Sequence, residues 1–187
     1  MQKTVDKAPL VPLLAPEKMS TAFRKLHDAG KERLGFANVN SLQAMAHGGE
    51  LAAAAREFLN AAWNLGSLDK RLRILIRLAV SSANDCRYCT AHQIHLLVDR
   101  LKLPAELVTA VTRAEDDKLV GKDRAVVRFA RAYTFSPGNV PADVQDDMKK
   151  HFNSQEIVEI VVVAGGMSML NGFNDGLGVP LEEEAHG

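Results

Sequence analysis

The sequence predicts an all-α fold in a single domain, and three observations lead to this prediction. Apolar residues recur at intervals of three and four along most of the chain, which is the period of an amphipathic helix. Glycine and proline separate these segments, and no two alternating segments form a convincing hairpin. With 187 residues, 47% of them hydrophobic, the chain is long enough to bury a core without disulfides.

We divide the chain into an extended N-terminal arm at residues 1–16, one helical domain at 17–180 and an acidic tail at 181–187. Pro9, Pro12 and Pro16 make the arm extended, because proline fixes φ and has no backbone N–H to donate. Arms of this kind often lie on a neighbouring molecule. We therefore predict that the arm docks on another subunit.

The first half of the domain is predicted to hold three helices. The first covers residues 17–29 and stops at Gly30, before a turn-rich connection at 31–40. The second begins at Leu51 and is ended by Gly66, and Ser67 is expected to cap the third. This third helix has a polar stripe formed by Lys70, Arg73, Arg77, Ser81 and Asn84, opposite an apolar stripe formed by Leu72, Leu75, Ile76 and Ala79.

The second half continues with helices joined by polar connections. Asp85 is expected to cap a helix that runs from Cys86 to about Leu101. The remaining predicted elements are a helix from Pro104 to Thr112, a charged loop at 113–121, an amphipathic helix around Val126–Tyr133, a turn at Ser136–Gly138, and a helix from Pro141 to Lys149.

The last helix is predicted from Ser154 to Asn171. Asn153 and Glu156 resemble a capping box before it. The β-branched run at 160–163 would also suit a strand, but the caps, the length and the lack of a pairing strand favour a helix. Gly165 and Gly166 in its middle permit another helix to approach closely, at a propensity cost of about 1 kcal/mol each.

Composition excludes several classes of function. Lys plus Arg and Asp plus Glu both number 23, and aromatic residues are 5% of the chain, so nothing favours binding to nucleic acid. The longest apolar stretch, Ile160–Met167, is far shorter than the roughly 18 residues of a membrane span, and the N-terminus shows no export signal. We therefore expect a soluble, cytoplasmic protein without membrane or nucleic-acid partners.

The two cysteines, Cys86 and Cys89, form a CxxC motif at the predicted start of a helix. There the helix dipole and free N–H groups stabilise a thiolate and lower the cysteine pKa. The spacing also lets the two sulfurs form and break a disulfide without large backbone movement. The CxxC motif could serve redox chemistry, bind a metal or have arisen by coincidence. Its position after Asp85 favours redox chemistry.

Neighbouring side chains could assist this chemistry. At 100° per residue, Gln93 projects about 20° from Cys86 and His92 about 60° from Cys89, whereas His95 lies about 120° from Cys89. Cysteines and histidines on one helix fan too widely to surround a tetrahedral zinc ion without further ligands, so no metal site is predicted. The ordinary readings are a partly packed His92 and a solvated Arg77.

Several segments together resemble the alkyl hydroperoxidase D-like proteins of the carboxymuconolactone decarboxylase superfamily, over most of the chain. They are Leu68–Arg71, Ala79–Asn84 followed by Cys86–Cys89, Arg124–Ala130, Glu156–Ile160 and Asn174–Pro180. The resemblance implies an all-helical bundle that assembles as trimers or hexamers, with the cysteine pair in a pocket near a subunit boundary. It also implies a dithiol that reduces peroxide or relays electrons from a thiol donor.

Two positions depart from the pattern of the redox members. Those proteins usually carry a glutamate twelve residues before the first cysteine and a histidine four residues after the second, as a proton relay. Ile74 and Gln93 occupy these positions here, and neither side chain titrates. His92 is the best replacement for the missing base, and Asp85, Arg77 or Glu50 could supply charge.

Our hypothesis is a CxxC-dependent thiol peroxidase or disulfide reductase of antioxidant defence, with no cofactor. Cys86, Cys89 and His92 are its expected catalytic residues; Gln93, Arg77 and Asp85 are auxiliary, with Arg77 or Gln93 polarising the peroxide. Which cysteine attacks stays open. The alternatives are a non-enzymatic redox-sensing or structural oligomer, and a carboxymuconolactone decarboxylase-type lyase, which would work without the cysteines.

Overall fold

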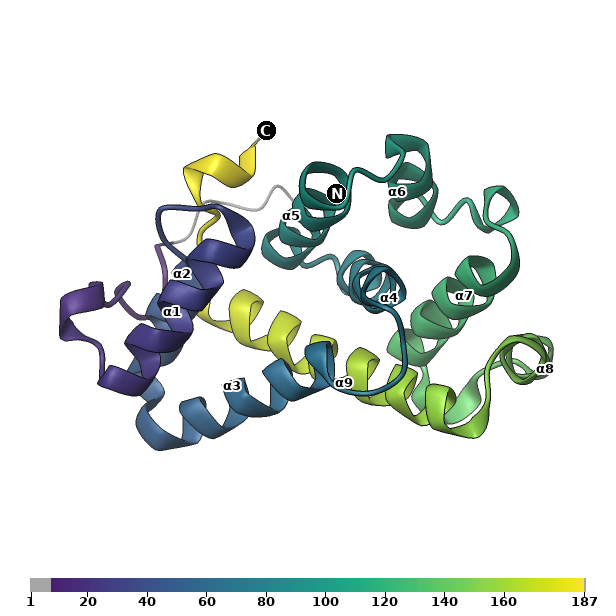
Figure 1. Cartoon of the computed structure of the whole chain (residues 1–187), viewed down its shortest axis with the longest axis horizontal. Coiled ribbons are helices and arrows are strands. Elements are labelled where there is room, and N and C mark those ends of the chain that lie inside the picture. The colour runs from purple at the N-terminus through teal and green to yellow at the C-terminus, as the bar shows by residue number, and fades with distance from the viewer. Residues whose placement is uncertain (1–7, 187) are drawn as a thin grey trace.

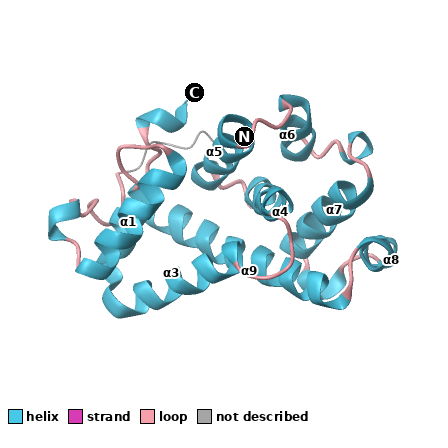
Figure 2. Ribbon diagram, in the orientation of Figure 1, coloured by secondary structure: helices cyan, strands magenta, loops and turns pink. Residues whose placement is uncertain are grey.

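The structure is a computed structural model that describes residues 8–186, and no strand occurs within that range. The α-helices are α1 (Thr21–Leu34), α2 (Asn40–Met45), α3 (Gly49–Asn64), α4 (Lys70–Ala83), α5 (Arg87–His95), α6 (Ala105–Thr112), α7 (Gly121–Phe135), α8 (Ala142–His151) and α9 (Ser154–Leu177). Figure 2 shows the helices joined by short loops. The predicted all-α class is confirmed.

Helix α4 lies at the centre of the fold. It packs against α5, α7 and α9, which surround it in Figure 1. Residues 74–76 and 78–80 of α4 are at most 1% exposed, so the helix is buried on all sides. The polar stripe predicted to face away from the apolar one is therefore buried as well at Arg73, Arg77 and Ser81.

The first helix is longer than predicted. Gly30 does not end α1, which continues to Leu34 and ends at Gly35 in the left-handed conformation. Gly30 is buried where α1 meets the start of α2, and a Cβ there would lie 3.0 Å from Leu42 Cδ1. The residue serves close packing between helices rather than chain reversal, and residues 31–34 of the predicted turn-rich connection are helical.

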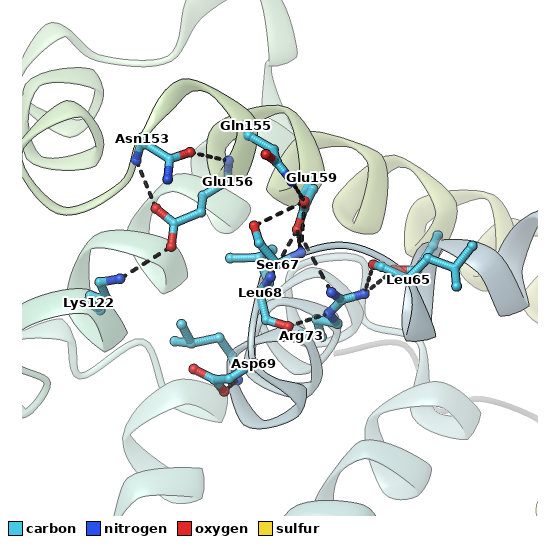
Figure 3. A network of polar contacts seen from close by, with 12 residues as sticks. Leu65, Ser67, Leu68, Asp69, Arg73, Lys122, Asn153, Gln155, Glu156 and Glu159 are labelled. Atoms are coloured by element: carbon cyan, nitrogen blue, oxygen red, sulfur yellow. Dashed lines mark hydrogen bonds and ion pairs between the residues drawn. The ribbon is translucent and has the colours of Figure 1, made fainter.

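The cap of α4 is also not the predicted one. Asp69 caps the helix by accepting a hydrogen bond from Leu72 N. Ser67 instead binds Glu159 of α9, whose carboxylate accepts from Ser67 N at 2.8 Å and from Leu68 N at 3.0 Å (Figure 3). This carboxylate lies 3.8 Å from Arg73 Nη2. It joins the start of α4 to α9.

Glu159 also explains the loop before α4. The bonds from Ser67 N, together with those from Gln155 and Leu68 N, lower the pKa of Glu159 to about 2. Gly66 has φ +95°, and a Cβ there would lie 2.5 Å from Glu159 Cδ. The loop therefore favours glycine at this position, first for its backbone conformation and also for its close approach to the carboxylate.

Helix α9 begins at the predicted capping box of Asn153 and Glu156, which is confirmed, and it extends six residues beyond the predicted end, to Leu177. Among the described residues, α9 is the one helix long and apolar enough to cross a membrane by length and composition. It packs against α3, α4 and α7. A Cβ on Gly166 would lie 3.2 Å from Leu59 Cδ2 of α3, which confirms the predicted close approach.

The two ends of the described chain pack on α9 and α5, respectively. In the predicted arm, residues 8–15 form no helix, and Leu10 N donates to Leu177 O at 2.8 Å. Its docking on a neighbouring subunit stays a prediction, and residues 1–7 lie outside the described range. The predicted acidic tail folds back toward α5 (Figure 1), where its Glu182 is buried.

Candidate functional site

The CxxC motif lies where α4 turns into α5. Asp85 does not cap α5 as predicted, because it adopts a left-handed conformation with φ +56° in the turn. Cys86 occupies the N-cap position instead, and its N–H donates to Ser81 O at 3.0 Å. The helix that follows is regular only to His95 and continues as a π-helical turn at Leu96–Arg100. Both thiols thus lie at the start of a helix, as predicted.

The two thiols are free, buried and unequal. A hydrogen bond between the two thiols raises the pKa of Cys86 and lowers the pKa of Cys89. Burial raises both, so the hydrogen bond decides which sulfur ionises first. Cys89 is therefore the sulfur of the pair that is favoured to ionise first, a choice that the sequence left open.

Two asparagines of α9 hold this sulfur, and we did not predict either as a site residue. Asn174 Nδ2 donates to Cys89 Sγ at 3.2 Å, and a hydrogen bond from Asn171 also lowers the pKa of Cys89. Both amides are fixed in turn, because Ser41 Oγ donates to Asn174 Oδ1 at 2.7 Å and Asn84 Nδ2 donates to Asn171 Oδ1 at 2.9 Å. Asn174 lies in a segment that carries the family resemblance, and this was the available signal.

A carboxylate supports His92. Nε2 of His92 lies 2.6 Å from Glu182 Oε2, and the Tyr88 hydroxyl donates to Glu182 Oε1 at 2.6 Å. Burial raises the pKa of Glu182, but the interactions with His92 and Tyr88 outweigh burial and leave the pKa lowered. Burial and this carboxylate raise the pKa of Tyr88. The pair His92–Glu182 thus supplies the histidine and carboxylate that Gln93 and Ile74 do not.

A cavity of about 30 Å³ adjoins Cys89. That volume is enough for one or two water molecules. Arg77, Tyr88, His92 and Gln93 line it with Cys89, and the Oε1 atom of Gln93 is buried without a hydrogen bond. Three of the predicted site residues, His92, Gln93 and Arg77, therefore meet beside one cysteine. Arg77 is buried, whereas the ordinary interpretation of the polar stripe was a solvated Arg77.

The other candidates lie elsewhere. Asp85 is exposed and lines a different hollow with Ser82 and Arg87; its charge reaches the site only indirectly, by raising the pKa of Asp175, a carboxyl in contact with Cys86. Glu50 is exposed on α3. Within the described residues, no group of three His, Cys, Asp or Glu side chains could hold a metal ion.

Comparison with known proteins places the cysteines inside a family domain. Residues 49–132 match the carboxymuconolactone decarboxylase family. This segment runs from the start of α3 into α7 and includes Cys86, Cys89 and His92. No curated protein sequence matches the chain.

Solved structures share the fold at low identity. An uncharacterized peroxidase-related protein from Ralstonia eutropha JMP134, with an alkylhydroperoxidase AhpD core, aligns with a TM-score of 0.84 and 20% identity, over 96% of this chain and 95% of that chain. A peroxidase-related protein from Silicibacter sp. TM1040 gives 0.76 and 24%, over 96% and 92%. The apo debrominase Bmp8 gives 0.77 and 21%, over 89% of each chain. The alkyl hydroperoxidase D-like fold is thus confirmed.

Proposed function

The chain contains a carboxymuconolactone decarboxylase family domain on an AhpD-like fold, and we propose that it is a CxxC-dependent thiol peroxidase or disulfide reductase of antioxidant defence. One observation carries the proposal: Asn174 Nδ2 donates a hydrogen bond to the Cys89 sulfur, beside Cys86 and at the edge of a cavity that His92 also lines. A buried pair of this kind has one sulfur ready to attack and a second ready to close a disulfide.

The reaction follows from this asymmetry. The Cys89 thiolate attacks the distal oxygen of a hydroperoxide; the O–O bond breaks, Cys89 becomes a sulfenic acid, and the alkoxide leaves as an alcohol after gaining a proton. The Cys86 thiol then attacks the sulfenic sulfur, forming the disulfide and releasing water. An external dithiol returns the pair to the reduced state and is oxidised to its own disulfide.

His92 is the residue we assign to proton transfer in these steps. Its Nε2 contact with Glu182 orients the imidazole. Arg77 and Gln93 would polarise the peroxide, since both line the cavity with Cys89. Asn174 keeps the thiolate in place through its Nδ2–H.

We also propose that the protein forms a homo-oligomer, as the family resemblance implies. The outer faces of α3 and α9 expose large apolar side chains, namely Leu51, Phe58, Leu65, Val158, Val162 and Met169. Between the two helices lies an apolar hollow of about 260 Å³. A second copy would cover this surface, and light scattering of Leu51→Glu would show a smaller particle than wild type.

A peroxide assay with a thiol regenerating system tests the enzymatic proposal. Cys89→Ser should abolish turnover, and Cys86→Ser should allow at most one turnover with a sulfenic acid trapped at Cys89. Thr90→Ser, in the same helical turn, is the matched control. Turnover in wild type equal to that of both cysteine variants would refute the peroxidase and leave the non-enzymatic oligomer.

The remaining readings give different results in the same variants. Lactone decarboxylation that persists without both cysteines would indicate the lyase. Release of bromide from a brominated pyrrole, with the two thiols oxidised to a disulfide, would indicate a debrominase; Bmp8 is named a debrominase, and its cysteine-to-alanine variant was solved with 2,3,4-tribromopyrrole.

A further inference from the structure

Three arginines surround one indole next to the cysteine pair. Arg33 comes from α1, Arg56 from α3 and Arg77 from α4. Their guanidinium carbons lie 5.7, 4.8 and 4.7 Å, respectively, from the ring centroid of Trp63. All four side chains line the cavity that adjoins Cys89. Three positive charges thus converge on one small space.

No carboxylate of the described residues neutralises them. Among the described residues, no side chain forms an ion pair or a hydrogen bond with these three guanidinium groups, although Arg71, Arg128 and Arg131 all pair with aspartates. The Nε atoms of Arg33, Arg56 and Arg77, and Nε1 of Trp63, are buried without a hydrogen-bond partner. The nearby Glu182 is already bound to His92 and Tyr88.

Unpaired buried charges are costly, because burial disfavours the charged form of a side chain. Burial and the charge of Arg33 lower the pKa of Arg56 to about 9. Burial lowers the pKa of Arg77 further, and only the Cys89 sulfur among its main influences raises it. One thiolate cannot balance three guanidinium groups. A cluster of this kind is stable when an anion from outside completes it.

We propose that this cluster binds the carboxylate of an organic acid, so that the substrate of the dithiol is a hydroperoxide that also bears a carboxylate. The substrate assignment rests on the proposed function, whereas the anion site does not. A carboxylate fits better than a phosphate, because a cavity of about 30 Å³ suits two oxygens on one carbon rather than four on a phosphorus. Guanidinium groups bind carboxylates with two parallel hydrogen bonds.

The geometry gives each residue a role. Arg56 and Arg77 are buried, and Arg33 is half-buried, so the acid enters past Arg33. The indole N–H of Trp63 donates to one carboxylate oxygen. Because Arg77 and Cys89 line the same cavity, a carboxylate bound by Arg77 lies near the attacking sulfur, and the cavity of about 30 Å³ must widen to admit the rest of the substrate. Arg33 and Arg56 are thus binding residues of the substrate.

Trp63 makes the test direct, since it is the only tryptophan of the chain. Its fluorescence is recorded while intact protein is titrated with butyrate, with butyramide as the uncharged match, and with inorganic phosphate, all at constant ionic strength. We expect butyrate to bind with a saturable change in fluorescence, and we expect no such change with butyramide or phosphate. Arg56→Met and Arg77→Met should weaken butyrate binding at least tenfold, whereas Arg124→Met, exposed on α7, should leave it unchanged.

A thermal melt separates a binding role from a structural one. Butyrate should raise the Tm of wild type, and Arg56→Met should lose this rise without a lower Tm in the absence of butyrate. Equal responses to butyrate and butyramide, tighter binding of phosphate, or a Tm of Arg56→Met well below that of wild type would each overturn the proposal.

The titration is repeated with Cys89→Ser, which cannot act as a peroxidase but should still bind butyrate. Butyrate binding without peroxidase activity in wild type would therefore refute the proposed function and leave the anion site standing. Peroxidase activity without butyrate binding would refute the anion site and leave the proposed function standing. In an active enzyme, a carboxylate-bearing hydroperoxide should show a KM at least tenfold below that of its amide, and this difference should vanish in Arg56→Met.

Discussion

Arg73 and Arg77 lie one turn apart on α4, and both are buried. The guanidinium of Arg73 donates to Leu68 O at 2.9 Å and to the carbonyls that end α3, and it lies near Glu159 (Figure 3). The guanidinium of Arg77 lies over the Trp63 ring, and its Nε is buried without a hydrogen-bond partner among the described residues. Arg73, which joins α3, α4 and α9, has hydrogen-bond partners for its guanidinium group. Arg77, which lines the cavity, has none among the described residues.

The largest expected effect contrasts the two arginines. Arg73→Met should lower the free energy of unfolding by about 3 kcal/mol, because it leaves Glu159 and buried carbonyls without their partner. Arg77→Met should change it by less than about 1 kcal/mol, since the lost contact with Trp63 is offset by the removal of an unpaired buried charge. Urea unfolding of both variants measures this, and equal losses would contradict the comparison.

The second effect concerns the loop that Glu159 holds. Gly66→Ala should lower the free energy of unfolding by about 2 kcal/mol, because alanine is strained at φ +95° and its Cβ would meet the carboxylate. Gly138→Ala serves as the control, since a Cβ there meets nothing within 4 Å. A Gly66→Ala protein as stable as Gly138→Ala would show that the loop can move away.

The third effect concerns the pKa of the Cys89 thiol, which we expect to depend on Arg77 and not on Arg73. Arg77→Met should raise the pKa of Cys89 by about one unit, because it removes a positive charge near the thiolate. At a pH below that pKa, iodoacetamide should then react with Cys89 about tenfold more slowly. Arg73→Met should leave the pH profile unchanged. A similar shift in both variants would mean that the effect is not local.

The smallest effect is pH-dependent. The pKa of Glu159 is lowered in the fold to about 2 from an ordinary 4.5, so its contribution to stability is present above pH 4.5 and is lost as the pH falls toward 2. Glu159→Gln should cost about 1 kcal/mol at pH 7. Its unfolding free energy should converge with that of wild type between pH 4.5 and 2. A constant difference would contradict this.

The sequence was sufficient where the signal is local. The helical period predicts most elements, and the capping box of Asn153 and Glu156 and the position of Cys86 and Cys89 depend on residues within one turn. It was misleading where a residue has two uses. Gly30 is a stop signal in the sequence, but in the structure it permits two helices to touch. A buried arginine stripe has the same spacing as a solvated one.

The rest of the site depends on contacts between distant residues, and no local pattern encodes them. Glu182 meets His92 across 90 positions of the sequence, and Asn174 meets Cys89 across 85. The sequence showed only that Ile74 and Gln93 could not act as a proton relay. No sequence pattern indicated that Glu182, which follows the last long helix, would contact His92.

Helix α9 carries Glu159 near its start and Asn174 near its end, and the fifteen helical steps from one to the other span about 22 Å. Glu159 binds the loop before α4, and Asn174 touches the reactive sulfur. Gly165 and Gly166 lie between the two and are the weakest part of the rod. Any force that bent α9 there would tilt the Asn174 amide away from Cys89, so the reactivity of the thiol is tied mechanically to the straightness of one helix.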